Sequence, residues 1–183
     1  MKKLIACLAV ALFLNTPAYA FDEAAAKELA TSKIAAWLNT PTVVDAVKAQ
    51  NEKHAALDEA GIKALDERWK GGDASLVDPV LGNDLSTYLK KVVADGGGLY
   101  TEIFVMDNKG LNVGQSDKTS DYWQGDEDKW SKTFSVGADA VHISEVEFDE
   151  STQTYQVQLS LPVNDGGAPV GAVTIGLNAE MLK

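Results

Sequence analysis

The chain has 183 residues, a formal net charge of −11 from 16 Lys and Arg against 27 Asp and Glu, and a single Cys. Its length is that of one domain of ordinary size. The negative charge argues against nucleic-acid and anionic-lipid binding, which need basic surfaces. A hydrophobic content of 45% excludes a disordered acidic tail.

The first twenty residues predict a secretory signal peptide. Lys2 and Lys3 form a basic start, and the apolar run Leu4–Leu14 is shorter than the roughly 20 residues needed to span a bilayer. Small residues in Ala18–Ala20 predict cleavage before Phe21 and a periplasmic protein. Cleavage would remove two Lys and the only Cys, so the mature chain would be more acidic and would lack a thiol.

Residues 21–98 are expected to form the N-terminal helical region of the domain. Apolar residues at helical spacing predict helices that carry Ala26–Trp37, Val43–Val47 and Ile62–Trp69 on their buried faces. A further short helix is predicted over Leu85–Val93.

Residues 99–183 are expected to form a sheet, because β-branched and aromatic residues dominate and turn residues separate the segments. Five antiparallel strands are predicted, in a meander, over residues 99–107, 111–116, 140–148, 155–163 and 170–177. Asp107–Gly110 and residues 149–152 are turn signals, and a short helix is predicted around residues 126–132. The fold class is therefore α+β.

This order of elements resembles the Cache-type (PDC, PAS-like) extracytoplasmic sensor domain. The resemblance is carried by Glu102–Gly110 as the opening hairpin, by Ser116–Trp130 as the loop and short helix that line the family's pocket, and by Leu161–Val173 as the closing hairpin. It implies a free-standing single Cache domain, with N-terminal helices packed on a five-stranded antiparallel PAS-like sheet. It also implies a pocket between the sheet and the connection from the second to the third strand.

The connection between the second and third strands is also where the residues themselves indicate a ligand site. The nine residues from Tyr122 to Trp130 include three large aromatic side chains, three acids and one Lys, which suits a small polar ligand. Tyr122 and Trp123 are expected to form a wall, Trp130 the floor, and Lys129 a counter-charge. The alternative is that Trp123 and Trp130 only plug the edge of the domain. The candidate ligand-binding residues are Ser116, Tyr122, Trp123, Asp126, Lys129, Trp130 and His142.

The ligand class is left open between an amine, a small carboxylate and an amino-acid-like molecule. Amino-acid-binding members of the family carry an Arg that clamps the ligand carboxylate, whereas this chain has Glu127 near that position. Arg68 is the only Arg in the chain. Ala172, Thr174 and Gly176 leave one strand face free of bulk, for a ligand or for a packed helix.

No cofactor or metal is expected, because the chain has two His and no metal-ligand spacing. His142 on the third strand is a candidate for the pocket, although a lone His is more often structural. His54 is expected to face solvent on a helix.

The sequence therefore predicts a sensor module without catalytic activity, which presents ligand occupancy to a membrane receptor or sensor kinase, as in chemotaxis. The alternative is a ligand-free interaction or inhibitor module in the periplasm. An enzyme using Asp126 with Asp117 or Glu127 is disfavoured, because these acids lie in polar sequence and a general acid needs a buried carboxyl. Family members dimerise through the first helix, which makes a homodimer one arrangement to test.

Overall fold

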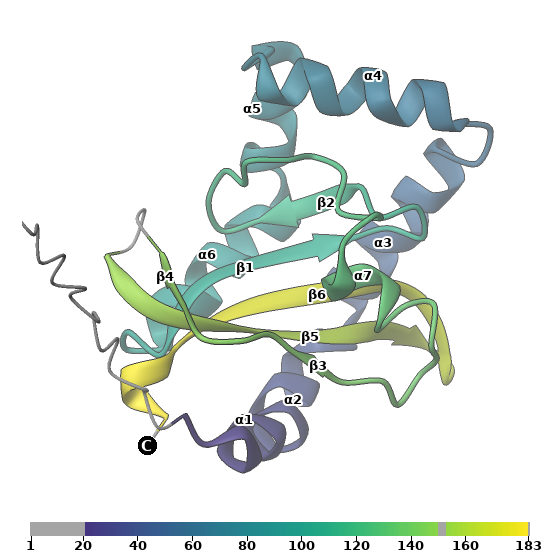
Figure 1. Ribbon diagram of the computed structural model, residues 1–183. Coiled ribbons are helices and arrows are strands. Elements are labelled where there is room, and N and C mark those ends of the chain that lie inside the picture. The colour runs from purple at the N-terminus through teal and green to yellow at the C-terminus, as the bar shows by residue number, and fades with distance from the viewer. Residues whose placement is uncertain (1–20, 150–152, 183) are drawn as a thin grey trace, which may run out of the picture.

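The computed structural model describes residues 21–149 and 153–182, and Figure 1 shows their arrangement. The predicted signal peptide and most of the predicted turn at residues 149–152 lie outside the described residues. The helices are α1 (Glu23–Leu29), a π-helical turn (Ala30–Ile34), α2 (Ala35–Leu38), α3 (Pro41–Lys53), α4 (Glu59–Lys70), α5 (Ala74–Gly82), α6 (Asp84–Asp95), α7 (Asp128–Ser131) and a 3₁₀ turn (Ala179–Met181).

The helix boundaries follow local signals in the sequence. The carboxylate of Asp22 accepts hydrogen bonds from the first turn of α1, and the carboxylate of Asp58 does the same for α4. Pro41 occupies the first turn of α3, where its missing N–H costs nothing. Asp73 caps α5, a helix that the sequence analysis did not predict.

The strands are β1 (Tyr100–Met106), β2 (Asn112–Gln115), β3 (His142–Ile143), β4 (Glu147–Asp149), β5 (Thr154–Asp165) and β6 (Ala168–Asn178). They form one antiparallel sheet in the order β2-β1-β6-β5-β3, and β4 also pairs with β5. The α+β prediction is confirmed.

The predicted meander is wrong, because the first and last strands of the sheet, β1 and β6, pair at its centre. The predicted strand over residues 140–148 is also divided into β3 and β4. The Ser144 hydroxyl accepts a hydrogen bond from the Gln158 N–H at 2.9 Å and donates to the Glu145 carbonyl at 2.7 Å, so side-chain bonds interrupt the ladder there.

The two faces of the sheet have different covers. The main apolar core lies between one face and the helices α1, α2, α3 and α6, and it joins residues of both halves of the chain. The other face carries a smaller apolar cluster of Phe104, Met106 and Ala172, covered by Trp130 and Phe134 from the α7 segment. In Figure 1, α7 lies in front of the sheet, and α4 and α5 project beyond the β2 edge.

Candidate functional site

A polar row crosses the sheet beneath α7. Gln115, Phe104, Thr174, Ser160 and His142 lie directly opposite one another on β2, β1, β6, β5 and β3. Directly opposed residues of antiparallel strands point to the same face, so these side chains form one row. All but His142 are buried, and the two hydroxyls lie 2.9 Å apart.

Gln115 ends this row on the edge strand β2. Its side chain is fully buried, and its Nε2 atom has no hydrogen-bond partner among the described residues. Asn112, also on β2, is fully buried as well, and its Oδ1 atom likewise has no partner among them. Leaving a buried donor or acceptor without a hydrogen bond costs about 1–3 kcal/mol of stability. This end of the sheet face therefore has one donor and one acceptor that are free to bond.

Beside the row, Glu102 places a carboxylate on the same face. Its Oε1 atom accepts hydrogen bonds from the side-chain amides of Gln156 at 3.4 Å and Gln158 at 3.2 Å. Burial raises the pKa of Glu102, and the hydrogen bond from Gln158 opposes that rise. A Cβ on the opposing Gly176 would clash with the Thr101 hydroxyl, so glycine permits this close approach of side chains.

An open cavity of about 560 Å³ adjoins the row, between α7 and the strands β3, β4 and β5. We call it the α7 cavity. It is lined by Glu127, Asp128, Lys129, Lys132, His142, Ile143, Ser144, Glu145, Glu147, Gln156 and Gln158. Its volume and its mainly polar lining suit a small polar molecule.

Of the residues predicted from sequence, the structure brings Lys129, Trp130 and His142 together at this face. Lys129 and His142 line the α7 cavity, and the Lys129 ammonium lies 5.5 Å from the centre of the Phe104 ring. Trp130 stacks on Phe134 with ring centres 5.1 Å apart, and it covers the apolar cluster. Burial lowers the pKa of His142, with the Lys132 charge acting in the same direction.

Tyr122 and Trp123 lie elsewhere, against α4. The ring of Tyr122 stacks on Trp69 with centres 5.3 Å apart, and the N–H groups of Tyr122 and Trp123 donate to the Asp66 carboxylate. These contacts hold the segment that follows β2 against helix α4. Burial raises the pKa of Tyr122, in keeping with its interior position.

Ser116 and Asp126 do not line the α7 cavity. The Ser116 hydroxyl accepts a hydrogen bond from the Ile103 N–H at 2.8 Å and thereby ties the end of β2 to β1. Asp126 is exposed on the segment that precedes α7.

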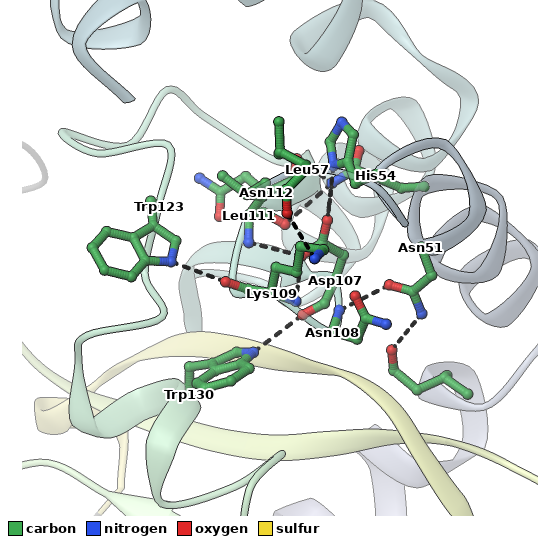
Figure 2. Close-up of polar contacts among 12 residues, drawn as sticks. Asn51, His54, Leu57, Asp107, Asn108, Lys109, Leu111, Asn112, Trp123 and Trp130 are labelled. Atoms are coloured by element: carbon green, nitrogen blue, oxygen red, sulfur yellow. Dashed lines mark hydrogen bonds and ion pairs between the residues drawn. The ribbon is translucent and has the colours of Figure 1, made fainter. Parts of the chain in front are cut away.

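The turn that joins β1 to β2 is organised by the fully buried carboxylate of Asp107 (Figure 2). Its Oδ1 accepts hydrogen bonds from the N–H groups of Lys109 and Leu111 at 2.8 and 2.9 Å. Its Oδ2 accepts from Gln50 Nε2 at 3.0 Å and lies 3.1 Å from His54 Nδ1. The prediction that His54 faces solvent is therefore wrong, because this contact draws the end of α3 onto the turn and buries the imidazole.

The backbone of the same turn holds the segment that covers the sheet. The indole N–H of Trp130 donates to the Asp107 carbonyl at 3.1 Å, and the indole N–H of Trp123 donates to the Lys109 carbonyl at 2.9 Å (Figure 2). The Lys109 ammonium donates to the carbonyl of Leu57, between α3 and α4. The turn therefore connects the cover of the α7 cavity to the corner between α3 and α4.

The sequence analysis missed Glu102, Gln115, Gln156, Gln158 and Ser160. For Gln156, Gln158 and Ser160, the available signal was the alternation along residues 155–163, whose polar positions are those expected to face water on a half-buried strand. In the structure, the α7 segment covers that face.

Within residues 21–149 and 153–182, no group of three or more His, Cys, Asp or Glu side chains is arranged to hold a metal ion. The same residues contain no helix with the length and apolar character required to cross a bilayer.

The fold and the site define an α+β domain with the strand order β2-β1-β6-β5-β3 and a polar cavity beside the short helix α7. No protein-family model matches the sequence, and the search of curated proteins gave no match. Among solved structures, the chain is similar to the ligand-binding domain of the Campylobacter jejuni chemoreceptor Tlp3 in complex with 4-methylisoleucine. The identity is 14% over 85% of this chain and 64% of that one, with a TM-score of 0.41.

Two further solved structures are similar over more than half of this chain. The V. cholerae histidine kinase DctB sensor domain is 10% identical over 85% of this chain and 54% of its own, with a TM-score of 0.40. The ligand-binding domain of the Pseudomonas aeruginosa PAO1 amino acid chemoreceptor PctC in complex with GABA is 17% identical over 67% and 58%, with a TM-score of 0.41. The chain thus spans less than two thirds of each of these domains. All three of these proteins are named as sensory or ligand-binding domains.

Proposed function

We propose that this chain is an extracytoplasmic sensor module that binds a small polar ligand in the α7 cavity and catalyses no reaction. The observation that carries the proposal is the position of the cavity, which adjoins a buried polar row and is closed on one side by α7. A volume of about 560 Å³ lies within the usual range for small-molecule sites.

The hydrogen bonds of the turn give ligand occupancy a route to the rest of the domain. Lys129 and Trp130 are neighbours on α7. A ligand that moves Lys129 would therefore also move Trp130 and change its hydrogen bond to the Asp107 carbonyl. The Asp107 carboxylate in turn holds His54 at the end of α3. A shift of α7 would therefore act on the α3–α4 corner, where a receptor or sensor kinase in the membrane could read it.

The acids weighed as a catalytic pair do not favour an enzyme. Asp117 and Asp126 are both exposed, which does not supply the buried carboxyl that general acid catalysis needs. Periplasmic localisation is part of the proposal and rests on the predicted signal peptide. Mass spectrometry of the exported protein should find Phe21 at its N-terminus, and light scattering would detect the homodimer that the resemblance implies.

A thermal-shift screen tests the binding function. The protein, exported with its own N-terminus, is screened against amino acids, amines, small carboxylates and purines. A ligand should raise the melting temperature by mass action. Gln158→Leu, which removes an amide from the cavity wall, should abolish the shift, and Lys91→Ala on the exposed side of α6 should not. If no compound shifts the transition, or if the two variants respond alike, the cavity is not the binding site and the interaction-module alternative is favoured.

A further inference from the structure

A second open cavity, of about 400 Å³, lies on the β3 side of the sheet, where the first helices pass the segment that leads into β3 (Figure 1). We call it the α2 cavity. It shares no lining residue with the α7 cavity. Its apolar walls come from Ala30, Ala35 and Leu38 on the helical side and from Val141, Leu161 and Pro162 on the facing side.

The lining of the α2 cavity differs in character from that of the α7 cavity. It is mainly apolar, with a small number of polar groups, which is the usual composition of a small-molecule site, and its volume lies within the usual range for such sites. Ala30 and Thr31 in its wall also belong to the π-helical turn between α1 and α2. Such turns are rare and occur frequently at functional sites.

One buried polar atom in the wall has no partner. The Nδ2 group of Asn164 donates to the Ala138 carbonyl at 3.0 Å, which fixes the orientation of the amide. Its Oδ1 atom is buried and has no hydrogen-bond partner among the described residues. A buried acceptor of this kind gains most from a ligand that brings a hydrogen-bond donor.

The other polar side chains of the wall do not replace this contact. Thr31, Asn39 and Asp139 are all exposed to water. The Thr31 hydroxyl also donates to the Glu28 carbonyl of its own helix at 3.0 Å. The buried part of the α2 cavity therefore presents apolar surface and the acceptor of Asn164.

From this combination we propose that the α2 cavity binds a small neutral aliphatic molecule that ends in a hydroxyl group, such as a medium-chain alcohol. The alkyl chain packs against Leu38, Leu161 and Pro162, and the hydroxyl donates to Asn164 Oδ1. The site is additional to the α7 cavity and does not rest on the function proposed for it.

The neutral donor is favoured over charged ends of the same size. An ammonium group at Asn164 Oδ1 would be buried against an uncharged oxygen, and burial of a charge without a counter-charge is costly. A carboxylate would place a second acceptor against the first. An ether would fill the same apolar space but would leave Asn164 Oδ1 without a donor.

Four probes of similar size test the ligand class by calorimetric titration: 1-hexanol, 1-methoxypentane, hexylammonium and hexanoate. 1-Methoxypentane has as many non-hydrogen atoms as 1-hexanol but no donor, and it should bind about three- to tenfold more weakly. The two charged probes should bind more weakly than 1-hexanol as well. Asn164→Ala should remove the preference for the alcohol over the ether.

A pair of neighbouring substitutions on α2 locates the site. Ala35→Leu fills the cavity from an exposed helix position and should abolish binding of 1-hexanol, whereas Ala36→Leu, which is exposed outside the cavity, should leave it unchanged. Gln158→Leu in the α7 cavity should also leave it unchanged, although Val141 in one cavity is next to His142 in the other.

The inference is overturned if 1-hexanol does not bind, or if the ether or a charged probe binds as tightly. It is also overturned if Ala35→Leu and Ala36→Leu have equal effects, because the binding would then be general adsorption to apolar surface. Loss of 1-hexanol binding in Gln158→Leu would assign the alcohol to the α7 cavity and equally refute the site.

Discussion

Asp107→Asn isolates the contribution of the buried carboxylate to the fold. The substitution keeps the shape of the side chain but replaces one acceptor oxygen with a donor group. The carbonyl of the new amide can still accept from the N–H groups of Lys109 and Leu111, which leaves its NH₂ group facing Gln50 and His54.

The magnitude follows from the bonds that change. Gln50 Nε2 loses a charge-assisted hydrogen bond and meets a second donor, although it keeps contacts with the carbonyls of Leu111 and Asn112. His54 can accept from the amide in its other tautomer, so its bond is weakened and not lost. Hydrogen bonds to charged groups contribute about 1.5–3 kcal/mol each, so we expect a loss of about 2–3 kcal/mol in unfolding free energy. For a domain of this size, that lowers the melting temperature by about 5–10 °C.

Urea unfolding measures this loss, with tryptophan fluorescence as the signal because Trp123 and Trp130 both bond to the turn. Asn108→Asp is the matched control. Asn108 lies in the same turn and is exposed, so its change should stay within about 0.5 kcal/mol. An Asp107→Asn protein that unfolds at the wild-type urea midpoint would refute the assignment of Asp107 as the organising group.

Three further substitutions give separate expectations. Gly176→Ala should lower stability by about 1–3 kcal/mol because the added methyl group overlaps the Thr101 hydroxyl, whereas Gly82→Ala, with open space around it, should be neutral or stabilising in thermal melts. Relative to wild type, Glu102→Gln should be more stabilising at pH 7 than at pH 4. The raised pKa of Glu102 means that the folded wild type holds its proton longer than the unfolded chain, so stability falls as pH rises above about 4.5; equal differences at both pH values would contradict this. Trp130→Phe keeps a ring on Phe134 but loses the bond to the turn, and urea unfolding should show a loss of about 0.5–1.5 kcal/mol.

Features governed by neighbouring residues could be predicted from the sequence. The turn at Asp107–Gly110 and the start of α3 at Pro41 both appear where expected, because side-chain caps and fixed backbone angles act within a few residues. The pairing of β1 with β6 could not be predicted in this way. It joins segments about seventy residues apart, and strand alternation specifies which face is buried but not which strand lies alongside.

The site was predicted only in part, because its contacts also join segments that are far apart in the sequence. Aromatic residues between 122 and 130 indicate burial, but composition does not say which of two clusters each ring joins. Trp130 covers the sheet, whereas Tyr122 joins Trp69 because Asp66 on α4 accepts from its backbone N–H. Gln115 and Glu102 belong to strands whose polar face is covered by a segment later in the chain, and a strand pattern alone assigns such a face to water.

The only arginine of the chain, Arg68, does not line the α7 cavity. Arg68 bonds to Asp73 at 2.8 Å on the exposed side of α4 and α5, so the only guanidinium of the chain serves a helix junction. Glu127, near the position where amino-acid-binding members of the family that the sequence resembles carry an arginine, lies 2.9 Å from the Lys129 ammonium. Both lysines that line the α7 cavity, Lys129 and Lys132, therefore already have a carboxylate partner.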